Sequence, residues 1–377
     1  MCFCAFVLCR TCQINIWYAD RHLHYQCGDV VMKKELQKSN ENGKYQELLD
    51  EADRLYDLGK YGDAVELLDK VPKGCSEYST SLYMKSMIIG INGDKKESFE
   101  IFKQFWLEEF GPESVDMDEE YKEFDMNDYR DLFDYGIYNY IFEDYEEAIR
   151  YFDLSLKLNP DQSEAFYYKA LSFAFLGKFK KAVKTIDKAI KLNPDNVRYW
   201  NDKGAFLSQL NFTVKAHNAF DRAISIESNN YSWSNKGILY CRYGKLDEAL
   251  DCFEKAIDLD ENDVTSLVVS AAIYSELKNC QKADEYFDRA ERIDCDNVIY
   301  LAERGKHLFN QNEFQKSIEY FDRYLKIDNE AAFVWMYKSM ALSELGRDEE
   351  SEMCFKKAYK LDPNSIDVFD EVVVIEE

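Results

Sequence analysis

One repeated spacing constrains the fold of this chain more than any other feature of its sequence. A small residue, alanine or serine, recurs near the middle of nine similar runs, in steps of 34, 50, 34, 34, 33, 34, 34 and 34 residues. These nine anchor positions are Ala64, Ser98, Ala148, Ala182, Ala216, Ala249, Ala283, Ser317 and Ser351. Because the step of 50 is one repeat plus 16 residues, the sequence predicts nine repeats with one insertion.

Other positions at fixed distances from the anchor also have the same type of side chain in every repeat or nearly every repeat. Four residues after it the side chain is large and apolar, and sixteen residues before it a second large apolar residue stands in all nine repeats. Twelve residues before it the side chain is small, and five residues before it Gly or Asn stands in seven repeats, with Glu143 and Lys278 as exceptions. Gly and Asn favour the left-handed backbone that ends many helices. Each repeat is therefore predicted to be a helix, a tight turn and a second helix, packed closely through the small residues.

The sixth repeat resembles the tetratricopeptide repeat family. The family pattern of Trp, Gly, Tyr, Ala, Phe and Ala is matched by Trp233, Gly237, Tyr240, Ala249, Phe253 and Ala256, while Lys236 and Glu261 replace its leucine and its proline. The resemblance covers residues 45–111 and 129–364. It implies an all-α fold, a right-handed α-solenoid of about nine tetratricopeptide-type helix-turn-helix repeats. The alternative, a non-repetitive helical bundle, does not account for nine repeats in phase.

The charge of the chain limits the class of its partner. The sequence holds 72 acidic and 47 basic residues, for a formal net charge of −25. Such a surface repels phosphate backbones and anionic lipids, so we predict a protein or peptide partner, no nucleic acid and no membrane. The basic run Lys178–Lys191 has the same apolar skeleton as the acidic run around Asp251. We interpret it as a solvated helix face on which the charges vary freely.

The cysteines and the apolar runs indicate a compartment. Past residue 31 the cysteines are single and scattered, which is not the pattern of a disulfide framework and favours a reducing environment. No apolar run approaches the length needed to span a bilayer. We therefore expect a cytoplasmic protein.

Residues 1–31 form an atypical N-terminal extension, for which three interpretations stay open. The segment is untranslated, because Met32 resembles an ordinary cytosolic start, or it is disordered, or it binds metal. In the third case four zinc ligands would come from a cluster of cysteines and histidines, namely Cys9, Cys12, His22, His24 and Cys27.

The rest of the chain is predicted to divide at the insertion. Residues 32–111 hold a lead-in and two repeats, residues 112–128 an acidic insertion, and residues 129–364 seven repeats. The insertion begins at Asp116 like a calcium loop, but Tyr121 and Asn127 occupy positions at which such a loop needs Gly and Glu. We interpret it as an acidic connection. Residues 365–377 are predicted to cap the last repeat.

The sequence shows no arrangement typical of catalysis. His217 and His307 stand 90 residues apart, one on a predicted second helix and one on a first helix, so a shared site is not expected. The Gly-Lys pairs fall at the predicted turns and lack the other residues of a phosphate loop. Because the repeats leave no stretch for a catalytic domain, we predict a protein that is not an enzyme and has no catalytic, cofactor-binding or metal site.

The family resemblance also implies where a ligand would lie. In tetratricopeptide repeat proteins it usually lies against the inner wall that the first helices form. The positions carried over to that wall are Arg130, Phe133, Ile137, Tyr140, Tyr167, Leu171, Arg198, Asn201, Asn235, Arg242, Lys306 and Phe309. Five of them would make an exposed aromatic and aliphatic patch, namely Phe133, Ile137, Tyr140, Tyr167 and Leu171. Alternatively, these five pack between repeats. The Arg and Asn positions from 198 to 242 would hold a peptide backbone or a carboxylate.

We therefore predict a non-enzymatic scaffold that binds a peptide or helix of a partner protein on the concave repeat surface. The alternative is a regulatory sensor whose repeat array binds a small signalling peptide or metabolite.

Overall fold

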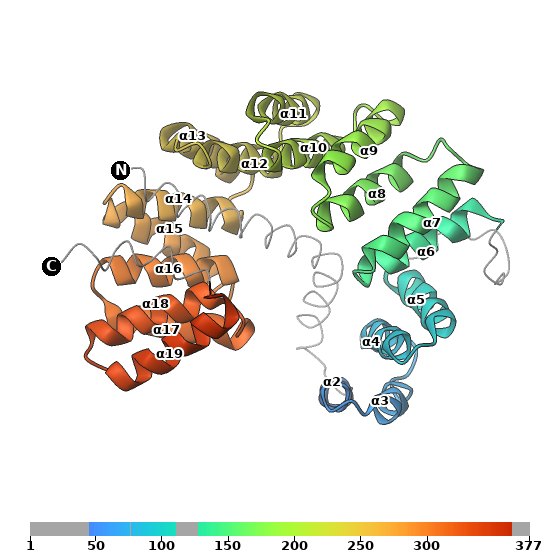
Figure 1. The fold of residues 1–377 in the computed structure, drawn as a ribbon, viewed down its shortest axis with the longest axis horizontal. Coiled ribbons are helices and arrows are strands. Elements are labelled where there is room, and N and C mark those ends of the chain that lie inside the picture. The colour runs from blue at the N-terminus through green and yellow to red at the C-terminus, as the bar shows by residue number, and fades with distance from the viewer. Residues whose placement is uncertain (1–44, 76, 111–126, 364–377) are drawn as a thin grey trace. The chain divides into compact units, whose positions relative to one another are not determined.

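The computed structural model describes residues 45–75, 77–110 and 127–363, and within them it contains eighteen α-helices and no strand. These residues divide into two compact units. The helices are labelled in Figure 1. The N-terminal unit ends at Ala219 and the C-terminal unit begins at Phe220, so the division falls within one helix. No helix in the described ranges has the length and apolar character needed to cross a membrane.

The helices alternate between the first and the second member of each repeat. The N-terminal unit holds α2 (Gln46–Asp57), α3 (Tyr61–Leu68), α4 (Tyr78–Ile91), α5 (Lys95–Phe110), α6 (Tyr129–Ile141), α7 (Tyr145–Leu158), α8 (Ser163–Phe175), α9 (Phe179–Leu192) and α10 (Val197–Gln209). Helix α11 (Thr213–Ile226) begins in this unit and ends in the next. The C-terminal unit continues with α12 (Asn230–Cys241), α13 (Leu246–Leu259), α14 (Val264–Glu276), α15 (Cys280–Ile293), α16 (Val298–Asn310), α17 (Phe314–Ile327), α18 (Ala332–Glu344) and α19 (Asp348–Leu361). The predicted all-α array of helix-turn-helix repeats is confirmed.

The turn inside each repeat has a left-handed residue five positions before the anchor. All nine of these residues have positive φ, and they are Gly59, Gly93, Glu143, Gly177, Asn211, Gly244, Lys278, Asn312 and Gly346. The two sequence exceptions, Glu143 and Lys278, each have a φ of 60°, so they adopt the same turn without the residue type that favours it. The predicted helix end is thus confirmed in every repeat.

The small and large positions of the repeat meet inside each helix pair. A Cβ atom added at Gly136 on α6 would lie 2.5 Å from the ring of Phe152 on α7, and one added at Gly305 would lie 2.5 Å from the ring of Phe321. Both phenylalanines are fully buried. The first helix therefore presents its backbone to the aromatic ring of the second helix, which explains why a small residue stands twelve positions before the anchor.

Serine at the anchor adds a hydrogen bond across the same contact. The Ser317 hydroxyl donates to the carbonyl oxygen of Gly305 at 2.8 Å, and the Ser351 hydroxyl donates to that of Ser339 at 2.9 Å. Because the two helices approach so closely, the short serine side chain reaches the facing backbone and its buried hydroxyl is satisfied.

Several predictions concern segments outside the described residues. These are the extension 1–31 with its five possible zinc ligands, the acidic insertion as far as residue 126, and the capping segment 365–377. The predicted domain boundaries at these segments stay predictions.

Candidate functional site

The twelve predicted contact residues fall into two groups, one in each unit. The N-terminal unit holds Arg130, Phe133, Ile137 and Tyr140 on α6, Tyr167 and Leu171 on α8, and Arg198 and Asn201 on α10. The C-terminal unit holds Asn235 on α12, Arg242 directly after it, and Lys306 and Phe309 on α16. Of these residues, the structure brings together Phe133, Ile137, Tyr140, Tyr167 and Leu171 in one cluster.

The predicted aromatic patch lies in the core of the N-terminal unit. Ile137, Tyr140, Tyr167 and Leu171 are buried in one cluster, and Phe133 is half-buried against it. The ring centroid of Tyr167 lies 4.8 Å from that of Tyr199 on the next first helix. The four buried residues are therefore not part of an exposed patch, and they pack between repeats in the structure. Large apolar side chains on a first helix fill the space beside the neighbouring repeat.

The hydroxyl of Tyr167 has a hydrogen-bond partner inside this core. It donates a hydrogen bond to Oδ2 of Asp202 at 2.8 Å. Burial, together with the negative charge of Asp202, raises the pKa of Tyr167 well above its usual value, so the phenol stays protonated. The aromatic ring and its hydroxyl thus both contribute to packing between α8 and α10.

The polar positions differ in how accessible they are. Arg130 and Arg198 are exposed, and the Arg198 guanidinium lies 5.6 Å from the ring centroid of Tyr167. Asn201 is only 1% exposed and Lys306 only 8% exposed, so the predicted access of a ligand to these two is wrong. Lys306 pairs instead with Glu303 at 2.7 Å. Asn235, Arg242 and Phe309 are half-buried, and a contact between these three and a partner stays a prediction.

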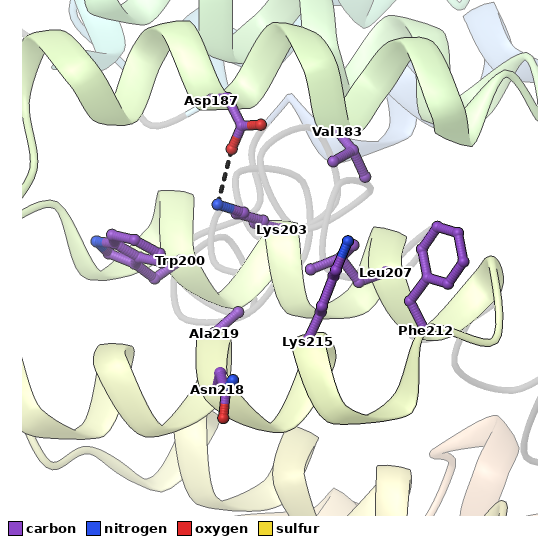
Figure 2. A pocket seen from close by; sticks show the side chains of 9 residues that line it. All are labelled: Val183, Asp187, Trp200, Lys203, Leu207, Phe212, Lys215, Asn218 and Ala219. Atoms are coloured by element: carbon purple, nitrogen blue, oxygen red, sulfur yellow. Dashed lines mark ion pairs between the residues drawn. The ribbon is translucent and has the colours of Figure 1, made fainter.

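A cavity of about 360 Å³ is lined by the second helices α9 and α11 and by the first helix α10, which lies between them in Figure 2. We call it the α9–α11 groove. It is lined by Val183 and Asp187 from α9, by Trp200, Lys203 and Leu207 from α10, and by Phe212, Lys215, Asn218 and Ala219 from the turn and from α11. None of these residues was among the predicted contacts, because the family resemblance implied a ligand against the first helices.

The repeat pattern itself builds the apolar part of this groove. Trp200 occupies the position sixteen residues before the anchor, and its indole Nε1 donates to the carbonyl oxygen of Pro194 at 2.8 Å. The left-handed turn at Asn211 places Phe212 directly before α11, where this side chain is 47% exposed. Leu207 lies buried below them. The groove therefore combines a fixed indole, an accessible phenyl ring and an aliphatic base.

The basic part of the groove consists of two lysines beside these rings. Lys203 Nζ lies 2.7 Å from Oδ1 of Asp187 and 4.8 Å from the ring centroid of Trp200 (Figure 2). Lys215 Nζ lies 5.3 Å from the ring centroid of Phe212. Cations over aromatic faces are attracted by the ring quadrupole. Both ammonium groups are thereby held close to apolar surface.

The Lys203–Asp187 pair belongs to a series that sequence reasoning missed. An aspartate five residues after the anchor pairs with a basic residue on the first helix of the next repeat. The pairs are Asp69–Lys85, Asp153–Lys169, Asp187–Lys203, Asp221–Lys236, Asp288–Arg304 and Asp322–Lys338. In the sequence, a basic residue 15 or 16 positions after each aspartate could have predicted these ion pairs. Each pair is partly exposed and contributes about 0.5 kcal/mol, so the series sets register more than stability.

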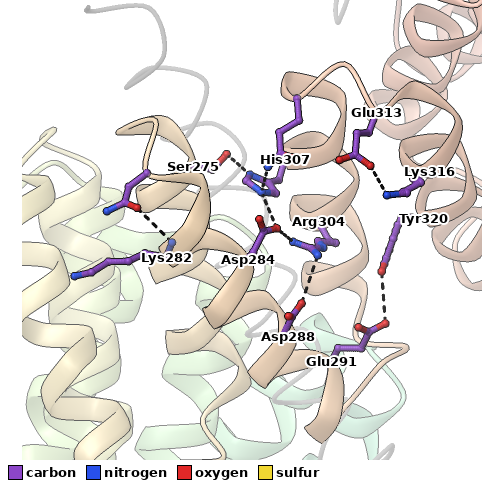
Figure 3. A network of polar contacts seen from close by, with 12 residues as sticks. Ser275, Lys282, Asp284, Asp288, Glu291, Arg304, His307, Glu313, Lys316 and Tyr320 are labelled. Atoms are coloured by element: carbon purple, nitrogen blue, oxygen red, sulfur yellow. Dashed lines mark hydrogen bonds and ion pairs between the residues drawn. The ribbon is translucent and has the colours of Figure 1, made fainter.

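A second polar cluster surrounds His307 in the C-terminal unit (Figure 3). His307 is 1% exposed, with Nδ1 2.7 Å from the Ser275 hydroxyl and Nε2 3.2 Å from Oδ1 of Asp284. Arg304 pairs with the same Asp284. These are the residue types of an acyl-transfer triad, but Ser275 lies in the last turn of α14, where the negative end of the helix dipole disfavours an oxyanion. We interpret the cluster as a structural connection between α14, α15 and α16.

The burial of His307 predicts how pH affects the C-terminal unit. Burial lowers the pKa of His307, and nearby Arg304 lowers it further, while Asp284 and Glu313 act in the opposite direction. In the unfolded chain the imidazole titrates at about 6.5, so below that pH the unfolded state binds more protons than the folded state. The free energy of unfolding is therefore expected to fall as the pH drops below about 6.5.

Hydrogen–deuterium exchange of α14–α16 peptides at about pH 7.5 and about pH 5 measures this effect. Rates are corrected for the intrinsic pH dependence of exchange. The His307→Gln variant serves as the control, because glutamine keeps a polar side chain but does not titrate. An equal loss of protection at low pH in both proteins would contradict the assignment to His307.

Within the described ranges no three or more His, Cys, Asp and Glu side chains are grouped so that they would hold a metal ion.

Comparison with known proteins identifies the repeat. Residues 140–197, 231–263 and 334–365 each match a sequence profile described as tetratricopeptide repeat. No curated protein gives a significant sequence match to the chain.

Solved structures resemble the chain at low sequence identity. The APC/C hetero-tetramer Cut9–Hcn1 is 13% identical, with 91% of this chain and 80% of that chain covered and a TM-score of 0.49. The type IV pilus biogenesis factor PilW is 16% identical, over 56% of this chain and 98% of that chain, with a TM-score of 0.49. PilF from Pseudomonas aeruginosa is 17% identical, over 57% of this chain and 97% of that chain, with a TM-score of 0.47. On the evidence of the three profile matches and the repeated helix pairs, the chain is a tetratricopeptide repeat protein.

Proposed function

We propose that this protein is a non-enzymatic scaffold that holds a peptide or helix of a partner protein in the α9–α11 groove. Tetratricopeptide repeat proteins are generally protein-interaction scaffolds and typically non-catalytic. The observation that carries the proposal is the cavity of about 360 Å³ with Trp200 and Phe212 in its wall. Aromatic side chains in such hollows supply much of the binding energy in protein interfaces.

This location differs from the inner wall that the family resemblance implied. Four of the predicted wall residues are buried in the core, and a side chain in the core has no surface left to offer a partner. Arg130 and Arg198 remain exposed on the first-helix side. A contact at these two arginines is compatible with the proposal and would extend the site from the groove onto the concave surface.

Photo-crosslinking at Phe212 tests the proposal. The full chain carries p-benzoyl-phenylalanine in place of Phe212 and is irradiated in its native cells. We expect a discrete adduct, because Phe212 lies at the mouth of the groove. Mass spectrometry identifies the adduct, and the purified partner is then titrated against the wild-type chain and against Trp200→Ala.

The matched control carries the same crosslinker at Phe355. This phenylalanine is 41% exposed on the second helix α19, close to the 47% of Phe212, and it does not line the groove. Adducts of the same protein and yield from both positions would count against the groove. So would a partner whose affinity is unchanged by Trp200→Ala.

A second candidate is a regulatory sensor that binds a small signalling peptide or metabolite. The cavity volume favours it, because small-molecule sites have roughly 300–1,000 Å³. The two candidates differ in ligand size. A fraction of cell extract below about 1 kDa that raises the melting temperature of the wild-type chain but not of Trp200→Ala would favour the sensor.

A further inference from the structure

Helix α9 differs in charge from the second helices of the other repeats. It carries five lysines and one aspartate in fourteen residues. Helix α13, two repeats later, carries five acidic residues and one lysine on the same apolar skeleton. At four equivalent positions a lysine of α9 corresponds to an acidic residue of α13, and the pairs are Lys180 and Asp247, Lys181 and Glu248, Lys184 and Asp251, and Lys191 and Asp258.

The lysines of α9 are accessible. All five are exposed, and among the described residues none of the five forms an ion pair with an acidic side chain. Lys180, Lys184 and Lys191 are spaced three or four residues from Val183 or Asp187, which line the groove. On a helix this spacing places side chains on one side. The lysines therefore form a basic border along the α9 edge of the groove.

We propose that the α9–α11 groove binds an acidic segment of a partner protein, with an apolar or aromatic anchor packed along the wall formed by Trp200, Leu207 and Phe212. This inference rests on the proposed function and specifies its partner. The three border lysines, together with Lys215 on the opposite edge, would face the carboxylates of that segment. The indole, the phenyl ring and Leu207 would take up its apolar anchor.

The attraction of an acidic segment to the groove depends on the local charge beside the groove and not on the net charge of the chain. At physiological ionic strength charges separated by more than about 8 Å are largely screened. The border lysines are on α9, which lines the groove, whereas most of the acidic residues that give the net charge of −25 are on other helices. The groove therefore attracts an acidic segment although the protein as a whole is acidic, and this attraction weakens as salt is added.

A nucleic acid fits this surface less well than an acidic peptide does. Fourteen helical residues extend over about 21 Å, so the basic border covers only a short length of a phosphate backbone. A longer nucleic acid would continue over surface of the opposite charge. A short acidic peptide with one apolar anchor can contact both the border lysines and the apolar wall of the α9–α11 groove.

Fluorescence anisotropy with the full chain and labelled synthetic probes tests the inference. Four sets of 15-residue peptides are used: acidic with a central Phe-Leu pair, acidic with Ser-Ser at the centre, neutral with Phe-Leu, and basic with Phe-Leu. A 15-nucleotide oligothymidine is the fifth probe. We expect the acidic Phe-Leu set to bind tightest, and its Kd to increase about tenfold when salt is raised from low to high concentration.

A charge-swap variant copies the acidic residues of α13 onto α9. It contains Lys180→Asp, Lys181→Glu, Lys184→Asp and Lys191→Asp, all at exposed positions. We expect it to bind the acidic Phe-Leu set at least about tenfold more weakly than the wild type does. Lys357→Glu with Lys360→Glu, two exposed lysines of α19, is the matched control and is expected to bind like the wild type. Circular dichroism confirms that both variants are folded.

Several outcomes would overturn the inference. These are neutral or basic peptides that bind as tightly as the acidic set, oligothymidine that binds as tightly, a charge-swap variant with unchanged affinity, or no binding up to millimolar peptide. If neutral peptides bind and Phe212→Ala abolishes their binding, the scaffold proposal stands and only the acidic partner is wrong. If crosslinking at Phe212 also yields no partner, the proposed function itself fails.

Discussion

Replacing Phe152 by alanine is expected to lower the free energy of unfolding of the N-terminal unit by about 4 kcal/mol. The phenyl ring is fully buried in the core between α6, α7 and α8 and lies next to the rings of Phe133 and Tyr168. Its removal loses the burial of an aromatic side chain and leaves a cavity that two rigid helices cannot close. Urea unfolding followed by circular dichroism, together with hydrogen exchange of α6 and α7, measures the loss.

The Phe152 ring also determines whether the substitution Gly136→Ala stabilises or destabilises the protein. In the wild type, Gly136→Ala would place a methyl group 2.5 Å from the Phe152 ring, so we expect a net destabilisation of about 1 kcal/mol although alanine favours helix. In the Phe152→Ala background the methyl group enters the vacated space. There the same Gly136→Ala change is expected to stabilise by about 1 kcal/mol.

Gly62 provides the control for helix propensity in the same unit. It lies in α3, and a Cβ atom added there has no neighbour within 4 Å. Gly62→Ala is therefore expected to stabilise by about 0.5 kcal/mol in both backgrounds. If Gly136→Ala has the same sign with and without Phe152, the small position is not explained by contact with the ring.

The repeat pattern predicts so much of the fold because it records contacts between backbone and ring. Glu143 and Lys278 illustrate how strong this constraint is. Neither residue favours positive φ, yet each adopts a φ of 60° because the helices on both sides of the turn are fixed by the Gly136–Phe152 type of contact. A local preference that disagrees with the array is overridden by the packing of the array.

The candidate site was harder to predict, because the repeat marks residues such as Trp200 for packing and does not show which of them line an accessible groove. Tyr167 and Phe212 are both aromatic residues in a repeat, and only the side of the helix and the position in the turn decide that one is buried and the other exposed. An error of about half a helix turn, roughly two residues, in the assumed orientation of α8 would move a residue such as Tyr167 from the buried to the exposed side. The lysines of α9 were visible in the sequence, but their meaning depends on the groove that α10 and α11 form beside them.

The second large effect is expected for Tyr167, and it separates stability from binding. Tyr167→Ala removes a buried ring that packs against Tyr168 and Tyr199, and it removes the hydrogen bond to Asp202. We expect the free energy of unfolding of the N-terminal unit to fall by about 4 kcal/mol. Tyr167→Phe keeps the ring and loses only the hydroxyl, so a loss of about 1–2 kcal/mol is expected.

Phe212→Ala gives the contrast that makes the Tyr167 result informative. Its ring is about half exposed, so its removal is expected to cost less than about 1 kcal/mol of stability while it weakens partner binding by at least about tenfold. Urea unfolding and partner titration are measured on the same preparations. If Tyr167→Ala abolished binding with its unfolding curve unchanged, Tyr167 would be a contact residue and its burial in the core would be wrong. A stable Phe212→Ala variant that no longer binds, beside a destabilised Tyr167→Ala variant, places the partner on the second-helix side of the repeats.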